Sequence, residues 1–293
     1  MQDRVYKQVV VLSGKGGTGK TTLAAVLSSL LMNKVIVDCD VDAANLHIAL
    51  NPVENKSFEF SGSKKAEIDT ENCSKCGLCE SLCRFDAIKD FSVNPAACEG
   101  CGLCFRACPS DAVIFQDVQT GKYFESTLSD GTKLYYAKLN PGEGNSGKLV
   151  TEIKKLAVKN IIDDIQWMIV DGPPGIGCPV NASIASADFA ILVTEPTVTG
   201  VHDLKRIITL LNKFRIKYGI VVNKYDINEK ETGVITAYAS EVNIPVLGLI
   251  PFNNKFKDDF VSGINFKEMI SGIREPIEEI ITKMIQYLNI SVN

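Results

Sequence analysis

Histidine is scarce in this sequence, and long apolar runs are missing. Only His47 and His202 occur among 293 residues, which argues against a histidine-rich metal site or a Ser–His–Asp triad, so we interpret both as packing or capping residues. No uninterrupted apolar stretch approaches the roughly 20 residues that a membrane helix needs. The first residues lead into the apolar run Val9–Leu12 without a basic region or a cleavage site, so we expect no secretory signal. The chain is therefore expected to be soluble and cytoplasmic.

A large excess of one charge is also missing. Lysine and arginine total 31 against 35 aspartates and glutamates, a formal net charge of −4. This charge gives no electrostatic support for binding nucleic acid or an anionic membrane, and we expect neither as a partner. The 45% of hydrophobic and 23% of charged residues are typical of a globular protein. The length allows one large α/β domain with a small insert, or two modest domains.

Cysteine, in contrast, is abundant and clustered. Eight of the ten cysteines fall between Cys73 and Cys108, a distribution that a scattered disulfide framework would not produce. In a chain without an export signal, such a cluster is more often a metal site.

Short apolar strands alternate with helical patterns over most of the chain. Several of these strands end directly before polar or glycine-rich segments, and the run 21–31 has apolar spacing suited to a helix. The expected strands are Val9–Leu12, Lys34–Val37, Trp167–Val170, Phe189–Val193, Gly219–Val222 and Val246–Ile250. This pattern predicts an α/β fold with a mostly parallel sheet covered by helices on both faces. In such sheets the ligand binds at the carboxyl ends of the strands.

Residues 61–117 interrupt this alternation. They contain an internal repeat in which the run Cys73–Cys83 returns 25 residues later as Cys98–Cys108. Removing them leaves a continuous α/β series, which predicts a host domain of residues 1–60 and 118–293 with an inserted domain of residues 61–117. The turn-rich stretch 120–147 predicts a small hairpin beneath the insert. The last segment, Ile273–Leu288, predicts a core-packing helix, since its polar face is acidic rather than basic.

A Walker A motif follows the first strand and precedes the first helix, the context that makes this motif significant. It reads Gly14-Lys15-Gly16-Gly17-Thr18-Gly19-Lys20-Thr21, followed by Thr22. Its backbone N–H groups are expected to surround phosphate oxygens at the positive end of the helix. Lys20 is expected to reach the β- and γ-phosphates, and Thr21 to bind Mg²⁺. Asp171, which ends an apolar strand, suits the Walker B carboxylate that holds Mg²⁺ through water.

The second lysine of the loop, Lys15, makes it resemble the KGGxGK[ST] loop of the MinD/ParA/nitrogenase iron protein superfamily. The resemblance covers the host domain and extends to the segment Val37–Asn45. It implies a P-loop ATPase that binds ATP or ADP with Mg²⁺ and forms a homodimer around the nucleotide. Lys15 would then reach the partner's nucleotide as an arginine finger does, and Asp40 would position the attacking water, with Asp38 and Asp42 as alternatives.

The segment Asn223-Lys224-Tyr225-Asp226 resembles the guanine-reading NKxD motif of GTPases. In MinD-type proteins the asparagine at this place contacts adenine instead. The resemblance to the superfamily therefore favours ATP over GTP, with Asn223 at the base.

The pattern Cys-x₂-Cys-x₂-Cys-x₃-Cys occurs twice, and Pro109 follows the second run. It resembles the signature of bacterial ferredoxins, small α+β domains with two clusters in which the fourth cysteine of each run binds the other cluster. The resemblance implies two [4Fe–4S] clusters, one held by Cys73, Cys76, Cys79 and Cys108 and the other by Cys98, Cys101, Cys104 and Cys83. Arg84 replaces the usual proline in the first run and removes no ligand. Two zinc sites are the alternative, although zinc knuckles usually separate two CxxC pairs by a longer loop.

Two cysteines remain outside the insert. Cys39 is interpreted as a buried small residue. Cys178 lies seven residues after Asp171, where the nitrogenase iron protein has a cysteine that helps to hold a cluster between subunits. This resemblance leaves two interpretations open, a plain turn cysteine or a metal ligand at a dimer interface.

Together these features predict a homodimeric ATPase in which hydrolysis switches the ferredoxin-like insert or its partner surface. In one function, ATP gates electron transfer from the clusters to a redox protein or metalloprotein, as in nitrogenase-like reductases. In the other, the chain matures or delivers a metal cofactor or iron–sulfur cluster, as Mrp and carbon monoxide dehydrogenase accessory ATPases do. A MinD-like spatial organiser is a third possibility, which the acidic C-terminal helix does not favour.

Overall fold

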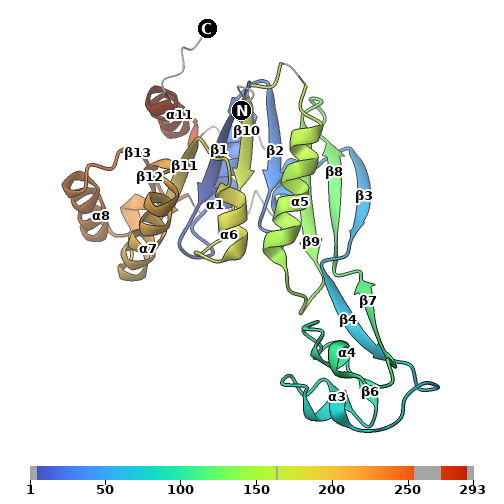
Figure 1. Ribbon diagram of the computed structural model, residues 1–293. Coiled ribbons are helices and arrows are strands. Elements are labelled where there is room, and N and C mark those ends of the chain that lie inside the picture. The colour runs from blue at the N-terminus through green and yellow to red at the C-terminus, as the bar shows by residue number, and fades with distance from the viewer. Residues whose placement is uncertain (1–4, 163, 254–271, 289–293) are drawn as a thin grey trace. The chain divides into compact units, whose positions relative to one another are not determined.

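The computed structural model describes residues 5–162, 164–253 and 272–288 (Figure 1). Its internal contacts divide the chain into two units. The larger unit takes in the chain up to Ser57, then Phe124–Ala137, and the chain from Ser146 onward. The smaller unit consists of Phe58–Tyr123 and Lys138–Asn145, and it contains the whole segment 61–117 that breaks the α/β pattern.

A nine-stranded sheet has the order β13-β12-β11-β1-β10-β2-β9-β8-β3. The strands are β1 (Lys7–Leu12), β2 (Lys34–Asp38), β3 (Glu54–Phe60), β8 (Gly121–Thr127), β9 (Lys133–Leu139), β10 (Trp167–Asp171), β11 (Phe189–Thr194), β12 (Lys217–Asn223) and β13 (Val246–Ile250). The seven strands from β13 to β9 pair in parallel. The prediction of an α/β fold with a mostly parallel sheet is confirmed, and all six expected strands are present.

Helices cover both faces of this sheet because both sets of alternating side chains are apolar. Val9 and Val11 of β1 pack in a core cluster with residues of α1 and α11, while Val10 and Leu12 are equally buried on the opposite face. Helices α5, α6 and α7 lie across the face turned toward the viewer in Figure 1. The helices of the larger unit are α1 (Lys20–Leu30), α2 (Leu46–Leu50), α5 (Ser146–Lys159), α6 (Cys178–Ile184), α7 (Val198–Phe214), η1 (Tyr225–Ile227), α8 (Glu229–Glu241) and α11 (Arg274–Leu288).

The C-terminal helix α11 packs in the core, as its sequence predicts. Ile277, Ile280 and Met284 are completely buried, and the helix contacts β13 and α1. In the part of the chain that the structure describes, no helix combines the length and apolarity needed to cross a bilayer.

The predicted hairpin in the stretch 120–147 forms, but its place in the fold differs from the prediction. Strands β8 and β9 extend the large sheet, and β9 pairs in parallel with β2 rather than forming a separate hairpin beneath the insert. The physical reason is the run Leu134–Ala137, in which four successive residues are buried. A strand that is buried on both faces needs a sheet neighbour and a core.

The smaller unit consists of short elements around its cysteine runs. Strand β4 (Ser63–Ile68) pairs antiparallel with β7 (Val113–Val118), and β5 (Ile88–Lys89) with β6 (Ser92–Val93). The helices α3 (Leu78–Ser81) and α4 (Leu103–Ala107) contact each other. The sequence repeat thus folds twice into a turn followed by one helical turn.

Glycine is required at a close approach in the second of these turns. Gly100 has a φ of +65°, and a Cβ added there would lie 2.2 Å from the carbonyl oxygen of Lys64. Any other residue would push the cysteine run away from β4.

Candidate functional site

Lys20 lies at the centre of the polar groups at the carboxyl end of the sheet. Its Nζ is 3.2 Å from Asp171 Oδ1 and 3.5 Å from Asp40 Oδ2, and its side chain is only 6% exposed. Burial disfavours the charged form, but attraction to Asp171 and then Asp40 outweighs it and raises the pKa of Lys20. The lysine is therefore a cation held in place by two carboxylates.

Asp171 ends β10 and is completely buried. Burial raises its pKa, while attraction to Lys20 and a hydrogen bond from Thr21 act in the opposite direction. Its Oδ2 atom has no hydrogen-bond partner within the described residues. A buried carboxylate oxygen without a donor, next to the hydroxyl of Thr21, is a donor set that suits Mg²⁺.

The three aspartates after β2 have different surroundings. Asp38 is completely buried, and its oxygens accept the N–H groups of Asp40 at 3.0 Å and Leu46 at 3.1 Å. Asp42 is exposed. Of the three, only Asp40 combines a side chain that is 16% exposed with a carboxylate next to Lys20. Asp40 thus lies beside Lys20, while the carboxylate of Asp38 is occupied by backbone N–H groups of the loop.

Lys15 is bound within its own chain to a residue that the motifs did not indicate. Its Nζ lies 3.5 Å from Glu195 Oε2 and donates a hydrogen bond to Thr197 Oγ1 at 3.3 Å. Glu195 also pairs with Lys224, whose Nζ in turn donates to the Gly17 carbonyl oxygen. Glu195 follows β11 directly, so the rule that ligands meet the carboxyl ends of parallel strands could have found it.

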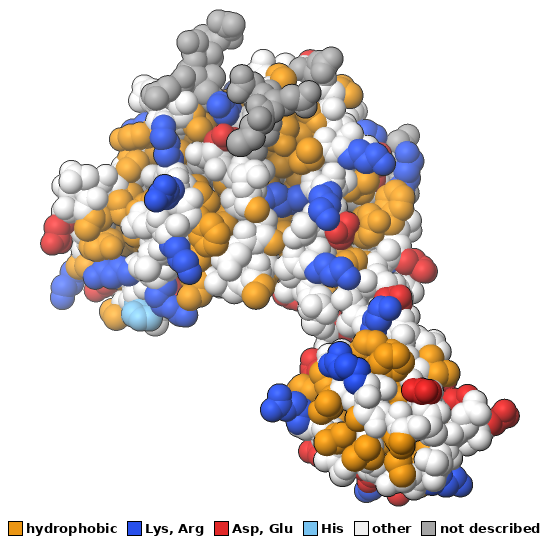
Figure 2. All heavy atoms as spheres, in the orientation of Figure 1, with side chains coloured by type: hydrophobic (Ala, Val, Ile, Leu, Met, Phe, Trp, Pro, Cys, Tyr) orange, Lys and Arg blue, Asp and Glu red, His pale blue; other side chains and the backbone are white. Residues whose placement is uncertain are grey.

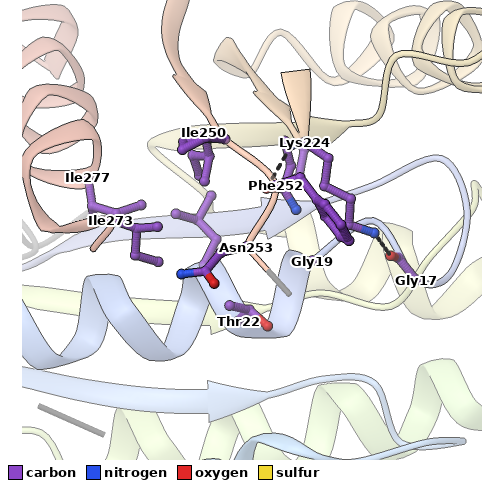
Figure 3. A pocket seen from close by; sticks show the side chains of 13 residues that line it. Gly17, Gly19, Thr22, Lys224, Ile250, Phe252, Asn253, Ile273 and Ile277 are labelled. Carbon is purple, nitrogen blue, oxygen red and sulfur yellow. Dashed lines mark hydrogen bonds between the residues drawn. The ribbon is translucent and has the colours of Figure 1, made fainter. Parts of the chain in front are cut away.

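A cavity of about 480 Å³ lies beside the phosphate-binding loop (Figure 3). Figure 3 shows Gly17 and Lys224 at one end of it and Ile273 and Ile277 at the other. The remaining lining residues are Gly19, Thr22, Leu23, Val193, Asn223, Ile250, Pro251, Phe252 and Asn253. An apolar slot next to a phosphate site suits a nucleotide base.

Asn223 and Asp226 have different positions relative to this cavity. Asn223 lines it and donates from Nδ2 to the Thr18 carbonyl oxygen at 2.8 Å. Asp226 is not among the lining residues, and its Oδ1 accepts the N–H of Phe252 at 2.7 Å. Asp226 thus supports the cavity wall and does not face the cavity. An NKxD aspartate that reads guanine has to face the base.

Each cysteine set expected from the sequence lines one small cavity of the smaller unit. The first cysteine cavity is lined by Cys73, Cys76, Cys79 and Cys108. The second cysteine cavity is lined by Cys83, Cys98, Cys101 and Cys104. The fourth cysteine of each run therefore lies with the other run's triple.

The cysteines of the described residues are free, and no three His, Cys, Asp or Glu side chains there converge as they would around a single metal ion. Two sulfurs already accept backbone N–H groups, Cys83 from Ala87 and Cys108 from Ala112, both at 3.3 Å. Thiolates spread around a cavity suit a polynuclear cluster better than one ion, because each thiolate of a [4Fe–4S] cluster binds its own iron.

The remaining histidines and cysteines take the following positions. Cys39 is completely buried, as predicted, and burial raises the pKa of its thiol. His47 stacks on Tyr136 with ring centroids 4.4 Å apart, as expected of a packing residue. The same interpretation is wrong for His202, whose side chain is exposed within α7. Cys178 is exposed at the first residue of α6.

A comparison with known families finds a match over most of the chain. Residues 9–266 match the CobQ/CobB/MinD/ParA nucleotide binding domain. The chain belongs to this family. The expected resemblance to MinD and ParA proteins is thereby confirmed, and with it a P-loop nucleotide-binding fold.

Individual relatives extend over nearly the whole chain. An uncharacterized protein of Methanocaldococcus jannaschii is 34% identical over 289 residues, covering 97% of this chain and 98% of its own. A cytosolic Fe-S cluster assembly factor NUBP2 homolog of Nematostella vectensis is 26% identical over 293 residues, covering 94% and 91%. The septum site-determining protein MinD of Pyrococcus horikoshii, solved with Mg-ADP, has a TM-score of 0.57 at 19% identity, covering 95% and 96%. This last likeness shows the fold alone.

Proposed function

We propose that this chain is a cytoplasmic, homodimeric ATPase that couples its nucleotide state to electron transfer through two [4Fe–4S] clusters in the smaller unit. The electrons would pass to a redox protein or metalloprotein. The observation that carries the proposal is that each of the two cysteine cavities is lined by one complete set of four thiols.

The nucleotide would bind along the cavity beside the phosphate-binding loop. The backbone of residues 14–19 surrounds the phosphates, Lys20 leaves its carboxylate partners for the β- and γ-phosphates, and Thr21 binds Mg²⁺. Asp171 orients the Mg²⁺ waters, and the unpaired Oδ2 supports this role. The lysine is thus neutralised by carboxylates in one state and by phosphate in the other.

Two residues would make hydrolysis depend on dimer formation. Asp40, beside Lys20, positions the attacking water. Lys15 leaves Glu195 and reaches the nucleotide of the partner subunit, where it stabilises charge that develops on the transferred phosphate.

Adenine is the base that the cavity favours. Asn223 lines the cavity and can turn its amide toward the base. The carboxylate of Asp226, which guanine would need, accepts the N–H of Phe252 instead.

In the smaller unit, the eight thiolates would each bind one iron, and the bound clusters would each supply one electron. The chain's own contribution is to hold the sulfurs on tight turns and to aim backbone N–H groups at them. Cys76 and Cys101 are exposed, and so are the apolar side chains of Leu78, Phe85 and Phe105. Figure 2 shows apolar side chains gathered on the visible surface of this unit, which supports contact with a protein partner.

Metal analysis of the chain purified without air tests the proposal directly. We expect about eight iron and about eight sulfide atoms per chain, four of each per cluster. A variant with Cys79→Ser and Cys104→Ser, one ligand from each cavity, should lose most of this iron, whereas Cys39→Ser should keep it. Two zinc ions per chain, or neither metal, would overturn the proposal.

Iron–sulfur cluster assembly or metal-cofactor delivery is the second candidate. The similarity to the cluster assembly factor homolog of Nematostella vectensis favours it, as does the exposed Cys178. In this function, iron bound beyond the two resident clusters should leave the protein on hydrolysis. A Cys178→Ser variant with unchanged metal content and unchanged release would speak against Cys178 as a ligand.

A further inference from the structure

The two cysteine cavities arise from one repeat, so the differences between them are few. In the first run Lys75 and Glu80 are the charged residues between the cysteines, and in the second run Glu99 and Arg106 are. All four side chains are exposed. Each run therefore carries one cation and one anion in contact with solvent, where the effects of charges are screened. Of these four residues, Glu99 alone lines a cysteine cavity, the second one.

One backbone hydrogen bond to sulfur is the same in both runs. The fourth cysteine of each run accepts the N–H group four residues later, Cys83 from Ala87 and Cys108 from Ala112, and both distances are 3.3 Å. This shared contact therefore gives no reason for the two sites to differ, although Cys108 also receives the backbone N–H groups of Ser110 and Val113.

A side chain breaks this symmetry. Ser110 Oγ lies 3.6 Å from Cys108 Sγ, within the range of a hydrogen bond to sulfur. The matching position after Cys83 is Phe85, which lines the second cysteine cavity and has no group to donate. When Cys108 is an iron-bound thiolate it can only accept, so the Ser110 hydroxyl is the donor.

We propose that the Ser110 hydroxyl raises the reduction potential of the cluster in the first cysteine cavity above that of the second. The inference rests on the proposed function, since it requires both clusters. One electron from a low-potential, one-electron donor adds one negative charge to a cluster, and no bond is formed or broken. Hydrogen bonds to the ligand sulfurs stabilise that added charge, whereas an apolar ring beside it does not.

Ser110 is thus a positioning residue that determines where an electron rests. The first cysteine cavity holds the first electron, and the cluster beside Phe85 is the stronger reductant. Arg84 also differs between the runs, but its exposed guanidinium acts through solvent. The hydroxyl of Ser110 acts directly on a ligand sulfur.

A titration of the anaerobic protein with dithionite, followed by electron paramagnetic resonance, tests this assignment. We expect two midpoint potentials. Ser110→Ala should lower the higher midpoint potential and leave the lower midpoint potential unchanged. Ser110→Thr, which keeps the hydroxyl, should have the same two potentials as the original chain. Phe85→Ser should raise the lower one. Ser81→Ala is the matched control and should leave both potentials unchanged, because Ser81 lines neither cysteine cavity and its hydroxyl donates to the Leu78 carbonyl oxygen.

The results separate this inference from the proposed function. Absence of iron and sulfide from the unaltered chain refutes the proposed function. If both clusters are present and Ser110→Ala moves neither potential, or moves the lower one, the inference is wrong. If Ser110→Ala loses iron, the Phe85→Ser variant becomes the test. A lower midpoint potential that does not rise in Phe85→Ser also contradicts the role of the hydroxyl.

Discussion

Asp38 is a carboxyl group that the fold buries completely at the end of β2. Burial, followed by the neighbouring Asp171, raises its pKa far above the ordinary value of 3.8. Between the ordinary pKa of 3.8 and the raised pKa of about 8, the folded chain binds more protons at this site than the unfolded chain does. The free energy of unfolding must therefore fall as the pH rises through this window.

Asp38→Asn should make this pH dependence shallower. The amide carries no charge that burial could penalise, although it loses one of the two oxygens that accept from Asp40 and Leu46. Near pH 5 we expect the variant to be less stable than the original chain. As the pH rises toward about 7.5, the free energy of unfolding should fall less in the variant than in the original chain, by about 1.4 kcal/mol for each unit of pKa elevation that the substitution removes. Urea unfolding at several pH values measures how the free energy of unfolding changes with pH in each protein. The same slope in both would contradict this role of Asp38.

Glu195 neutralises two lysines next to the phosphate-binding loop, Lys15 and Lys224. Glu195→Gln should leave these cations without their carboxylate and raise the affinity for Mg-ADP by about fivefold, since partly exposed ion pairs contribute about 1 kcal/mol. Isothermal titration calorimetry measures the affinity. Glu152→Gln, which alters a surface pair on α5, is the control, and weaker binding by the Glu195 variant would refute this role.

At the scale of elements, Lys154 joins α5 to the end of α6. Its buried ammonium group donates to the carbonyl oxygens of Ala182, Ser183 and Ala185 at 3.1, 2.7 and 2.6 Å. A cation at a helix C-terminus satisfies carbonyl groups that the helix leaves unpaired. The helix that follows the segment 172–177 is thereby fixed to its neighbour.

Lys154→Met should lower the free energy of unfolding by about 3 kcal/mol, because buried carbonyl oxygens lose a charged donor. Lys155→Met is a matched control on the same helix, since Lys155 pairs with Glu152 at the surface and should change stability by less than about 0.5 kcal/mol. Chemical denaturation of both variants checks the difference. Equal losses would mean that helix propensity, not the buried cation, accounts for the effect.

The same scale shows what could be predicted from the sequence and what could not. Strands such as Val9–Leu12 and Trp167–Val170 were predictable because burial on both faces requires continuous apolar runs. Strands β8 and β9 were misplaced because the turn signals around Asp130 and Gly131 indicate a hairpin without saying which sheet it joins. Sheet order depends on packing between distant segments, which periodicity does not contain.

In the candidate site, motif residues were predictable and their partners were not. Lys20 and Asp171 lie together as the Walker motifs require. Glu195 was missed because a single glutamate after a strand matches no motif, and Asp226 resembled a guanine reader because a short motif does not reveal that its carboxylate accepts from Phe252.

At the scale of the whole molecule, nucleotide binding should bring two chains together through Lys15. In Lys15→Ala the rate of ATP hydrolysis should fall by about a thousandfold or more, and ATP should no longer induce dimer formation. Lys20→Ala should lose nucleotide binding itself. Both variants should keep the iron of the original chain, because the eight cysteines of the two cysteine cavities lie in the other unit. Light scattering coupled to gel filtration, with and without Mg-ATP, measures the dimer. A Lys15→Ala protein that still dimerises with ATP would contradict the role across the interface.

Coupling between the nucleotide and the clusters can be measured as the rate of cluster oxidation after mixing with nucleotide. The dithionite-reduced chain, freed of excess reductant, is mixed with a low-potential acceptor, and the visible absorbance of the clusters is followed. We expect faster oxidation with Mg-ATP than with Mg-ADP or no nucleotide, and no acceleration in Lys20→Ala. One rate under all three conditions in the original chain would contradict this coupling.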